Sequence, residues 1–221
     1  MNVLILGATG MVGQGVLREC LLAGDVARVV TLGRTATGQQ HAKLREIVHP
    51  TLTDLSTIEA ELAGMDACFF CLGVSSAGMS EAAYTKVTYD LTLSVAQTLS
   101  RVNPAMTFVY VSGRGTDSTE HGRTMWARVK GKTENALLRL PFNAAYMFRP
   151  GAIIPLHGIT SKTKLYRFAY LILTPLFPLI RKFAPNAVTT TEQVGKAMLA
   201  VARNGFPKQI LEAADIVAKS S

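Results

Sequence analysis

Short apolar runs alternate with amphipathic stretches along this 221-residue chain. We predict buried strands where apolar residues stand together, and helices where they recur every three to four positions. The strands are predicted at residues 2–6, 27–32, 46–49, 66–72, 106–112, 143–151 and 209–212. The helices are predicted at residues 11–22, 80–102, 124–140 and 189–203. This alternation predicts the α/β class, with a doubly wound parallel sheet.

Two of the predicted helices carry more specific signals. Apolar residues at helical spacing predict the buried stripe of the helix at 80–102, namely Val87, Leu91, Val95, Leu99 and Val102. The helix at 189–203 opens on Thr189-Thr190-Thr191-Glu192, a capping-box pattern.

The first predicted strand leads directly into Gly7-Ala8-Thr9-Gly10-Met11-Val12-Gly13 and a helix. In such a turn, Gly7 lets the chain bend sharply and Gly10 lets backbone N–H groups approach a pyrophosphate, while Gly13 lets the helix pack closely on the sheet. The helix N-terminus adds free N–H donors and a partial positive charge. We therefore predict a bound diphosphate here; the alternative is an ordinary strand–helix turn that uses glycine.

The second predicted strand ends at Gly33-Arg34, where NAD-binding proteins place an Asp or Glu that accepts a hydrogen bond from the ribose 2′-OH. The sequence has no acid at this place. Arg34 can instead pair with a 2′-phosphate, with Thr35 or Thr37 adding a hydroxyl. A solvated loop arginine is the alternative. The missing acid favours NADP as the cofactor.

Composition narrows the class of protein. The length suits one domain over residues 1–221, and 48% hydrophobic with 17% charged residues is typical of a folded α/β chain and excludes a disordered one. A net charge of +8 suits nucleic acid, acidic lipid or phosphorylated small molecules. No basic run or aromatic–basic repeat favours nucleic acid, so we expect no nucleic-acid partner and a small-molecule substrate.

The cysteines predict neither a disulfide framework nor a metal site. Cys68 and Cys71 lie in a predicted strand, where residues three apart point to opposite faces, so both are expected to be core residues. Residues 1–22 lack a basic n-region, so we expect no signal peptide. These features predict a reducing, cytoplasmic location.

The segment 7–13 resembles the nucleotide-binding signature of the atypical and extended short-chain dehydrogenase/reductases. Within that superfamily the chain is similar to the NAD-dependent epimerase/dehydratase-like proteins and their Tat-interacting-protein-like oxidoreductase branch. Further matches are Cys71-Leu72-Gly73, Ser112, Lys130-Gly131-Lys132-Thr133-Glu134 and Phe148-Arg149-Pro150-Gly151. The resemblance implies a Rossmann-like fold with a small helical C-terminal substrate part, in which 151–190 is an inserted substrate-side or lid segment.

The resemblance also implies roles for single residues. Asp54 would hydrogen-bond near the adenine, although it could equally cap the short helix that follows. By the same resemblance, Leu72 and Gly73 would lie beside the cofactor ribose, and Pro150 and Gly151 would line the nicotinamide end. The cofactor-binding residues predicted are Gly7, Thr9, Gly10, Met11, Val12, Gly13, Arg34, Asp54, Leu72, Gly73, Lys130, Pro150 and Gly151.

The family's Tyr-x-x-x-Lys motif falls on Trp126-Ala127-Arg128-Val129-Lys130. Lys130 fits, but an indole has one N–H donor and no titratable proton, so Trp126 can bind an oxygen and cannot act as a general acid. Ser112 is predicted to bind the substrate carbonyl, which makes Ser112, Trp126 and Lys130 the catalytic candidates. The family's Asn after Val87 is Thr88 here, which weakens any proton relay through that position.

Three residues are considered as replacement acids: Tyr89, Tyr110 and His121. Each also has a purely structural interpretation. Tyr89 can flank the buried stripe of its helix, Tyr110 can be a core residue in the middle of its strand, and His121 can be an exposed loop residue. Without an assigned acid, two functions stay open. The first is an NADP-dependent oxidoreductase of small apolar carbonyl compounds, and the second is a catalytically impaired NADP-binding regulator or scaffold.

The stretch Phe168–Ile180 carries no charge and is flanked by basic residues. Interrupted by two prolines, it is too short to span a bilayer, which needs about twenty residues. It is predicted to be a lid over an apolar pocket; the alternative is peripheral membrane contact through 165–182.

Overall fold

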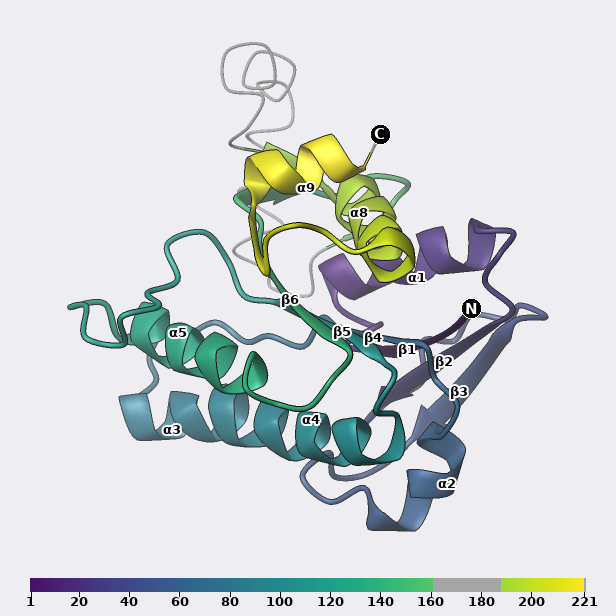
Figure 1. Ribbon diagram of the computed structural model, residues 1–221, viewed down its shortest axis with the longest axis horizontal. Coiled ribbons are helices and arrows are strands. Elements are labelled where there is room, and N and C mark those ends of the chain that lie inside the picture. The colour runs from purple at the N-terminus through teal and green to yellow at the C-terminus, as the bar shows by residue number, and fades with distance from the viewer. Residues whose placement is uncertain (161–187, 221) are drawn as a thin grey trace.

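A parallel sheet runs through the centre of the computed structural model, which describes residues 1–160 and 188–220 (Figure 1). Its strands are β1 (Asn2–Leu6), β2 (Arg28–Gly33), β3 (Leu44–Val48), β4 (Ala67–Phe70), β5 (Thr107–Val111), β6 (Ala144–Arg149) and β9 (Ile210–Glu212). Their order across the sheet is β3-β2-β1-β4-β5-β6-β9, and each neighbouring pair is parallel. The predicted doubly wound α/β fold is confirmed.

Helices cover both faces of this sheet. Figure 1 shows α1 (Met11–Leu22), α8 (Thr191–Asn204) and α9 (Ala213–Lys219) on one face. The opposite face carries α2 (Glu59–Leu62), α3 (Glu81–Thr85), α4 (Leu91–Val102) and α5 (Met125–Leu137). Strand β1 serves both cores, because successive side chains point to opposite faces. Val3 and Ile5 belong to the core under α1 and α8, whereas Leu4 and Leu6 belong to the core under α4 and α5.

The same alternation separates two cysteines. Cys68 lies in the core under α4 and α5, while Cys71 packs against the core under α1 and α8, as predicted. Burial raises the pKa of Cys71 to about 12, so its thiol is protonated and inert at neutral pH. Among residues 1–160 and 188–220, no three His, Cys, Asp or Glu side chains are placed to share a metal ion.

The helix predicted over residues 80–102 is interrupted by a π-helical turn, η2 (Lys86–Asp90), between α3 and α4. The wide turn changes which side chains face inward, so Val87 is 40% exposed while Tyr84 and Thr88 are buried. The predicted stripe is therefore wrong at Val87. A π-turn adds a residue to the helical repeat, which a constant spacing of apolar positions does not reveal.

The C-terminal part departs from the prediction in three ways. Strands β7 (Ala152–Ile154) and β8 (Val188–Thr190) form a separate parallel pair, and α9 follows the last strand. The capping box of α8 is made by Thr190 and Gln193, one residue later than predicted. Thr189 is instead a buried residue of β8.

The lid or membrane-surface segment Phe168–Ile180 lies outside the described residues, as does most of 151–190. None of the helices that the structure describes is both long and apolar enough to cross a bilayer.

Candidate active site

The site begins at the point where the sheet reverses its strand order. Strand β1 lies between β2 and β4, and the chain crosses to opposite sides of β1 on leaving it. In open α/β sheets, ligands bind at such a switch point, outside the carboxyl ends of the strands. The predicted glycine turn, 7–13, lies there.

Gly7 makes the sharp turn that was predicted. Its φ is 83°, a conformation that favours glycine, and its N-terminal neighbour ends β1. A Cβ on Gly7 would lie 2.7 Å from the backbone nitrogen of Leu72, so the turn packs directly on the end of β4. The Gly7 carbonyl accepts a 2.9 Å hydrogen bond from Gly10 and would overlap a Cβ on Gly13.

The N-terminus of α1 is open to an anion. Gly10 is its extended N-cap, no side chain caps this end among the described residues, and the first turn contains no acid. The backbone N–H groups of that turn therefore point to the carboxyl edge of the sheet without a competing carboxylate. Thr9, Met11 and Val12 are partly buried in the same turn. This arrangement fits a phosphate or diphosphate.

Arg34 is exposed on the loop after β2, as predicted. The structure adds an acid that the linear sequence did not place here. Glu46 on β3 lies beside Thr31 in the sheet and accepts hydrogen bonds from Thr31 Oγ1 at 3.2 Å and from Thr37 N at 2.6 Å. Burial opposes its ionisation, but hydrogen bonds from Thr37, Thr31 and the Gly38 backbone together outweigh burial and lower the pKa of Glu46.

Asp54 follows β3 and is exposed. Its Oδ1 accepts a 3.0 Å hydrogen bond from Ser56 N at the start of the short 3₁₀ helix η1 (Ser56–Ile58). That bond lowers the pKa of Asp54. The bond supports the turn before η1, but the N-cap of η1 is Leu55, so the capping role left open above is not the one that Asp54 takes. The contact near the adenine stays a prediction.

The ends of β4, β5 and β6 complete this edge of the sheet. Leu72 and Gly73 follow β4, Ser112 follows β5, and Pro150 and Gly151 follow β6. The loops after β5 and β6 are joined, because Arg114 N donates a 3.0 Å hydrogen bond to the Pro150 carbonyl. Since the strands are parallel neighbours, the predicted site residues on them lie along one edge.

Ser112 is buried, and its hydroxyl points into the protein. It donates to Glu134 Oε1 at 2.5 Å, and the Phe148 carbonyl, 3.1 Å away, is a second acceptor for the same proton. Its predicted contact with a substrate carbonyl would require the hydroxyl to leave these acceptors. The catalytic role of Ser112 stays a prediction.

Lys130 and Trp126 lie one helical turn apart on α5. The Lys130 ammonium donates to the Ser112 carbonyl. Burial lowers the pKa of Lys130 to about 8, although the Glu134 carboxylate acts in the opposite direction. The indole of Trp126 packs on the loop after β5, since a Cβ on Gly115 would lie 3.5 Å from it.

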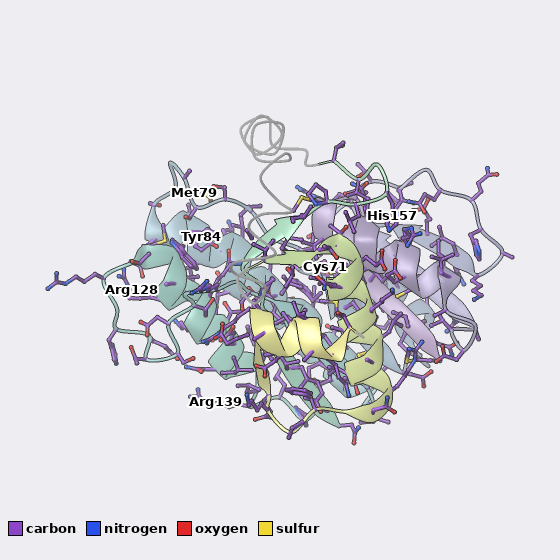
Figure 2. The ribbon with its side chains drawn as sticks, turned by 90° about the horizontal axis from the view of Figure 1, so that it is seen from above. Cys71, Met79, Tyr84, Arg128, Arg139 and His157 are labelled. Carbon is purple, nitrogen blue, oxygen red and sulfur yellow. The ribbon has the colours of Figure 1, made fainter. Side chains whose placement is uncertain are left out.

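The three replacement acids considered from the sequence have other surroundings. The ring of Tyr89 lies 4.6 Å from Lys132 Nζ, an arrangement typical of a cation–π contact. Tyr110 is fully buried in β5, which raises the pKa of its phenol. His121 is exposed. Tyr84, which sequence reasoning did not consider, is buried on α3 and lies, like Arg128 of α5, toward one end of the molecule (Figure 2).

Sequence reasoning missed the ion pair between Glu134 and Arg149 beneath this edge. The two side chains join α5 to β6, and both are nearly or fully buried. A signal was present, because Glu134 stands four residues after Lys130 and thus on the same side of the helix.

Comparison with known sequences identifies relatives. The sequence model of the NAD dependent epimerase/dehydratase family matches residues 3–123. Protein FMP52, mitochondrial, from Eremothecium gossypii is 31% identical over 156 residues, which cover 70% of this chain and 67% of that protein. Protein HTATIP2 from Rattus norvegicus is 26% identical over 156 residues, which cover 69% of this chain and 63% of that protein. The matched region spans about two thirds of these relatives' length.

Two solved structures show the same fold. DesIV, a dTDP-glucose 4,6-dehydratase from Streptomyces venezuelae with NAD and TYD bound, superposes with a TM-score of 0.70 at 17% identity, covering 95% of this chain and 74% of that one. The Bordetella bronchiseptica enzyme WbmF in complex with NAD+ gives a TM-score of 0.68 at 16% identity, covering 98% and 76%.

These relatives correct the predicted location. The fungal relatives are named as mitochondrial proteins, which contradicts the cytoplasmic prediction. The prediction rested on the lack of a disulfide framework among Cys20, Cys68 and Cys71 and on the lack of a basic n-region in residues 1–22. Free thiols indicate a reducing environment and do not identify the compartment.

Proposed function

The chain belongs to the NAD-dependent epimerase/dehydratase family, and we propose that it binds NADP and reduces or oxidises a small apolar carbonyl compound. A nicotinamide dinucleotide follows from the family, while the choice of NADP rests on Arg34 and its loop. The observation that carries the proposal is the uncapped, acid-free N-terminus of α1 behind the 7–13 turn, at the switch point of the sheet. We further propose one domain over 1–221, with 151–190 on the substrate side.

The residues of the carboxyl edge fit this cofactor. The 7–13 turn would hold the diphosphate, Leu72 and Gly73 would pass a ribose, and Pro150 and Gly151 would line the nicotinamide end. Lys130 would hold the nicotinamide ribose. Arg34 would pair with the 2′-phosphate of NADP, for which its exposed position on the loop after β2 is suited.

When bound, the nicotinamide supplies or accepts a hydride. Carbonyl reduction also places a proton on oxygen, and a positioned acid supplies it fastest. Trp126 would orient the carbonyl through its indole N–H. A pKa of about 8 keeps Lys130 protonated at neutral pH, so Lys130 Nζ would be a protonated group one helical turn from Trp126.

The apolar substrate class is inferred from the uncharged stretch Phe168–Ile180 in the substrate-side segment. The test is to titrate the protein with NADPH and NADH and then to follow NADPH absorbance with aldehydes, ketones and quinones. Binding followed by turnover supports the oxidoreductase. No binding of either dinucleotide refutes the proposal.

The second candidate is an NADP-binding regulator or scaffold. It is favoured by Trp126, which replaces the family's catalytic phenol with a group that has no titratable proton. Tight NADPH binding without turnover of any compound in the panel supports this candidate over the first.

A further inference from the structure

Glu134 is a fully buried carboxylate on α5, with no exposed surface. The guanidinium of Arg149, 9% exposed on β6, reaches both of its oxygens. Arg149 Nε lies 3.1 Å from Oε1 and 3.2 Å from Oε2, and Nη2 also donates to Oε2. A buried charge of this kind is costly unless it is paired, and this one is paired through a forked contact.

The carboxylate has a third donor that belongs to the site. Ser112 Oγ donates to Glu134 Oε1 at 2.5 Å, so Glu134 joins α5 to the ends of both β5 and β6. Arg149 extends the contacts to Ser118 Oγ at 2.6 Å and to Glu212 at 3.5 Å. The loop after β5 is therefore held at its start, by Ser112, and near its middle, by Ser118.

Lys130 contacts the same serine at its backbone carbonyl. Its ammonium donates to the Ser112 carbonyl, while the Ser112 hydroxyl donates to Glu134. Glu134 also stands one turn after Lys130 on α5, and its negative charge favours the charged form of the lysine. Within residues 1–160 and 188–220, the charge that acts on Lys130 is that of Glu134 on its own helix, and Glu134 is paired with Arg149 of β6, which also contacts Glu212 of β9.

We propose that Glu134 is a positioning residue that fixes the place and the charge of Lys130. It does so through Ser112, whose backbone carbonyl receives the ammonium, and through its own negative charge one turn away. Arg149 offsets the cost of burying the Glu134 carboxylate by pairing with it. The inference rests on the proposed function only in giving Lys130 a task; the interaction itself is testable without cofactor.

The experiment measures the titration of Lys130 in the cofactor-free protein. The protein is labelled with acetic anhydride at a series of pH values, and acetylation of Lys130 is followed by mass spectrometry. The wild-type midpoint is expected near pH 8. In Glu134→Gln the Lys130 midpoint should fall to about pH 7. The variant removes an opposite charge one helical turn from Lys130, and such a charge shifts a pKa by about 1 or more.

Two further variants keep the test decisive. Glu134→Gln leaves Arg149 buried without its partner and can fail to fold, so Glu134→Gln with Arg149→Met removes both charges together. The midpoint should fall in this double variant as well. Glu81→Gln is the matched control. Glu81 of α3 pairs at 2.7 Å with Arg128, which stands two residues before Lys130 on α5 and therefore points to another side of that helix. Loss of the Glu81 charge should leave the midpoint of Lys130 unchanged.

An unchanged Lys130 midpoint in a folded Glu134 variant overturns the inference and leaves the ion pair as a support for packing alone. An equal fall in the Glu81→Gln control also overturns it, since the effect would then be general. Failure of the wild type to bind NADPH refutes the proposed function and leaves the labelling result unaffected.

Discussion

Glu46 on β3 accepts a 2.6 Å hydrogen bond from the backbone N–H of Thr37, in the loop that follows the neighbouring strand β2. An acid therefore lies beside β2 and the loop that follows it, although it comes from the neighbouring strand. Its oxygens are engaged by Thr31 and the loop backbone, so Glu46 anchors the loop that carries Arg34. We expect cofactor preference to depend on whether Arg34 or Glu46 contacts the ribose.

We expect NADPH to bind at least about tenfold more tightly than NADH, because a charge-assisted hydrogen bond contributes about 1.5–3 kcal/mol. Arg34→Asp should abolish the preference. Titration calorimetry with both dinucleotides, and with 2′,5′-ADP as a probe of the phosphate site, measures it. Arg45→Gln is the control, since it removes an equal charge from β3, where Arg45 pairs with Glu61. Equal dissociation constants in the wild type would contradict the prediction and favour a ribose contact by Glu46.

Gly13→Ala should disrupt the turn that holds the diphosphate. A Cβ there would overlap the Gly7 carbonyl oxygen, and overpacking costs about 1–3 kcal/mol, or a few degrees in the unfolding midpoint. NADPH affinity should fall together with stability. Gly24→Ala is the control, because a Cβ on Gly24 meets no atom within 4 Å. A Gly13→Ala protein with unchanged midpoint and affinity would show that the turn does not bind the cofactor.

Trp126→Tyr should increase carbonyl reduction. It would place a phenol one helical turn from the Lys130 ammonium, whose charge lowers the phenol's pKa, and a positioned acid contributes about 10²–10⁴ in rate. Steady-state rates on small aldehydes and ketones test this. Trp126→Phe provides the control, because it changes the ring without supplying a hydroxyl. If the wild type turns over rapidly and Trp126→Tyr slows it, then Trp126 shapes a site that has another acid.

Stability should fall in acid through Glu192. Hydrogen bonds from Lys196 at 2.6 Å and from His157 at 2.7 Å lower the pKa of Glu192 from 4.5 to about 2. A carboxyl with a depressed folded pKa stabilises the protein above its unfolded pKa, and this stability is lost as pH falls from 4.5 towards 2. The Glu192 side chain is 27% exposed. We therefore expect its two partners together to contribute about 1 kcal/mol to the free energy of unfolding at neutral pH.

Thermal unfolding of the wild type and Glu192→Gln from pH 7 to pH 3 measures this contribution. The difference between their midpoints should be about 2–4 °C at neutral pH and should shrink as the pH falls. Glu61→Gln, which removes the carboxylate of the exposed pair with Arg45, should show a smaller difference at neutral pH. A difference between wild type and Glu192→Gln that stays constant over the whole range would contradict the prediction.

Local patterns in the sequence determined the fold class and the edge at which the site lies. The apolar run 2–6, the glycine spacing of 7–13 and the helical repeat after it are signals within one strand–turn–helix. They predicted β1 and α1 with their observed bounds. Parallel strands then bring Ser112, Pro150 and Gly151 to the same edge, whatever their separation in the chain.

The tertiary structure decided what depends on partners distant in sequence. Only packing shows that Glu46 reaches the loop of Arg34, that the Ser112 hydroxyl faces Glu134, and that a π-turn exposes Val87. The periodicity of apolar positions predicts whether a side chain is buried. Its hydrogen-bond partner is set by the neighbouring strand or helix. For that reason the sequence by itself predicted Lys130 as a site residue, and the fold determined its hydrogen-bond partner, the Ser112 carbonyl.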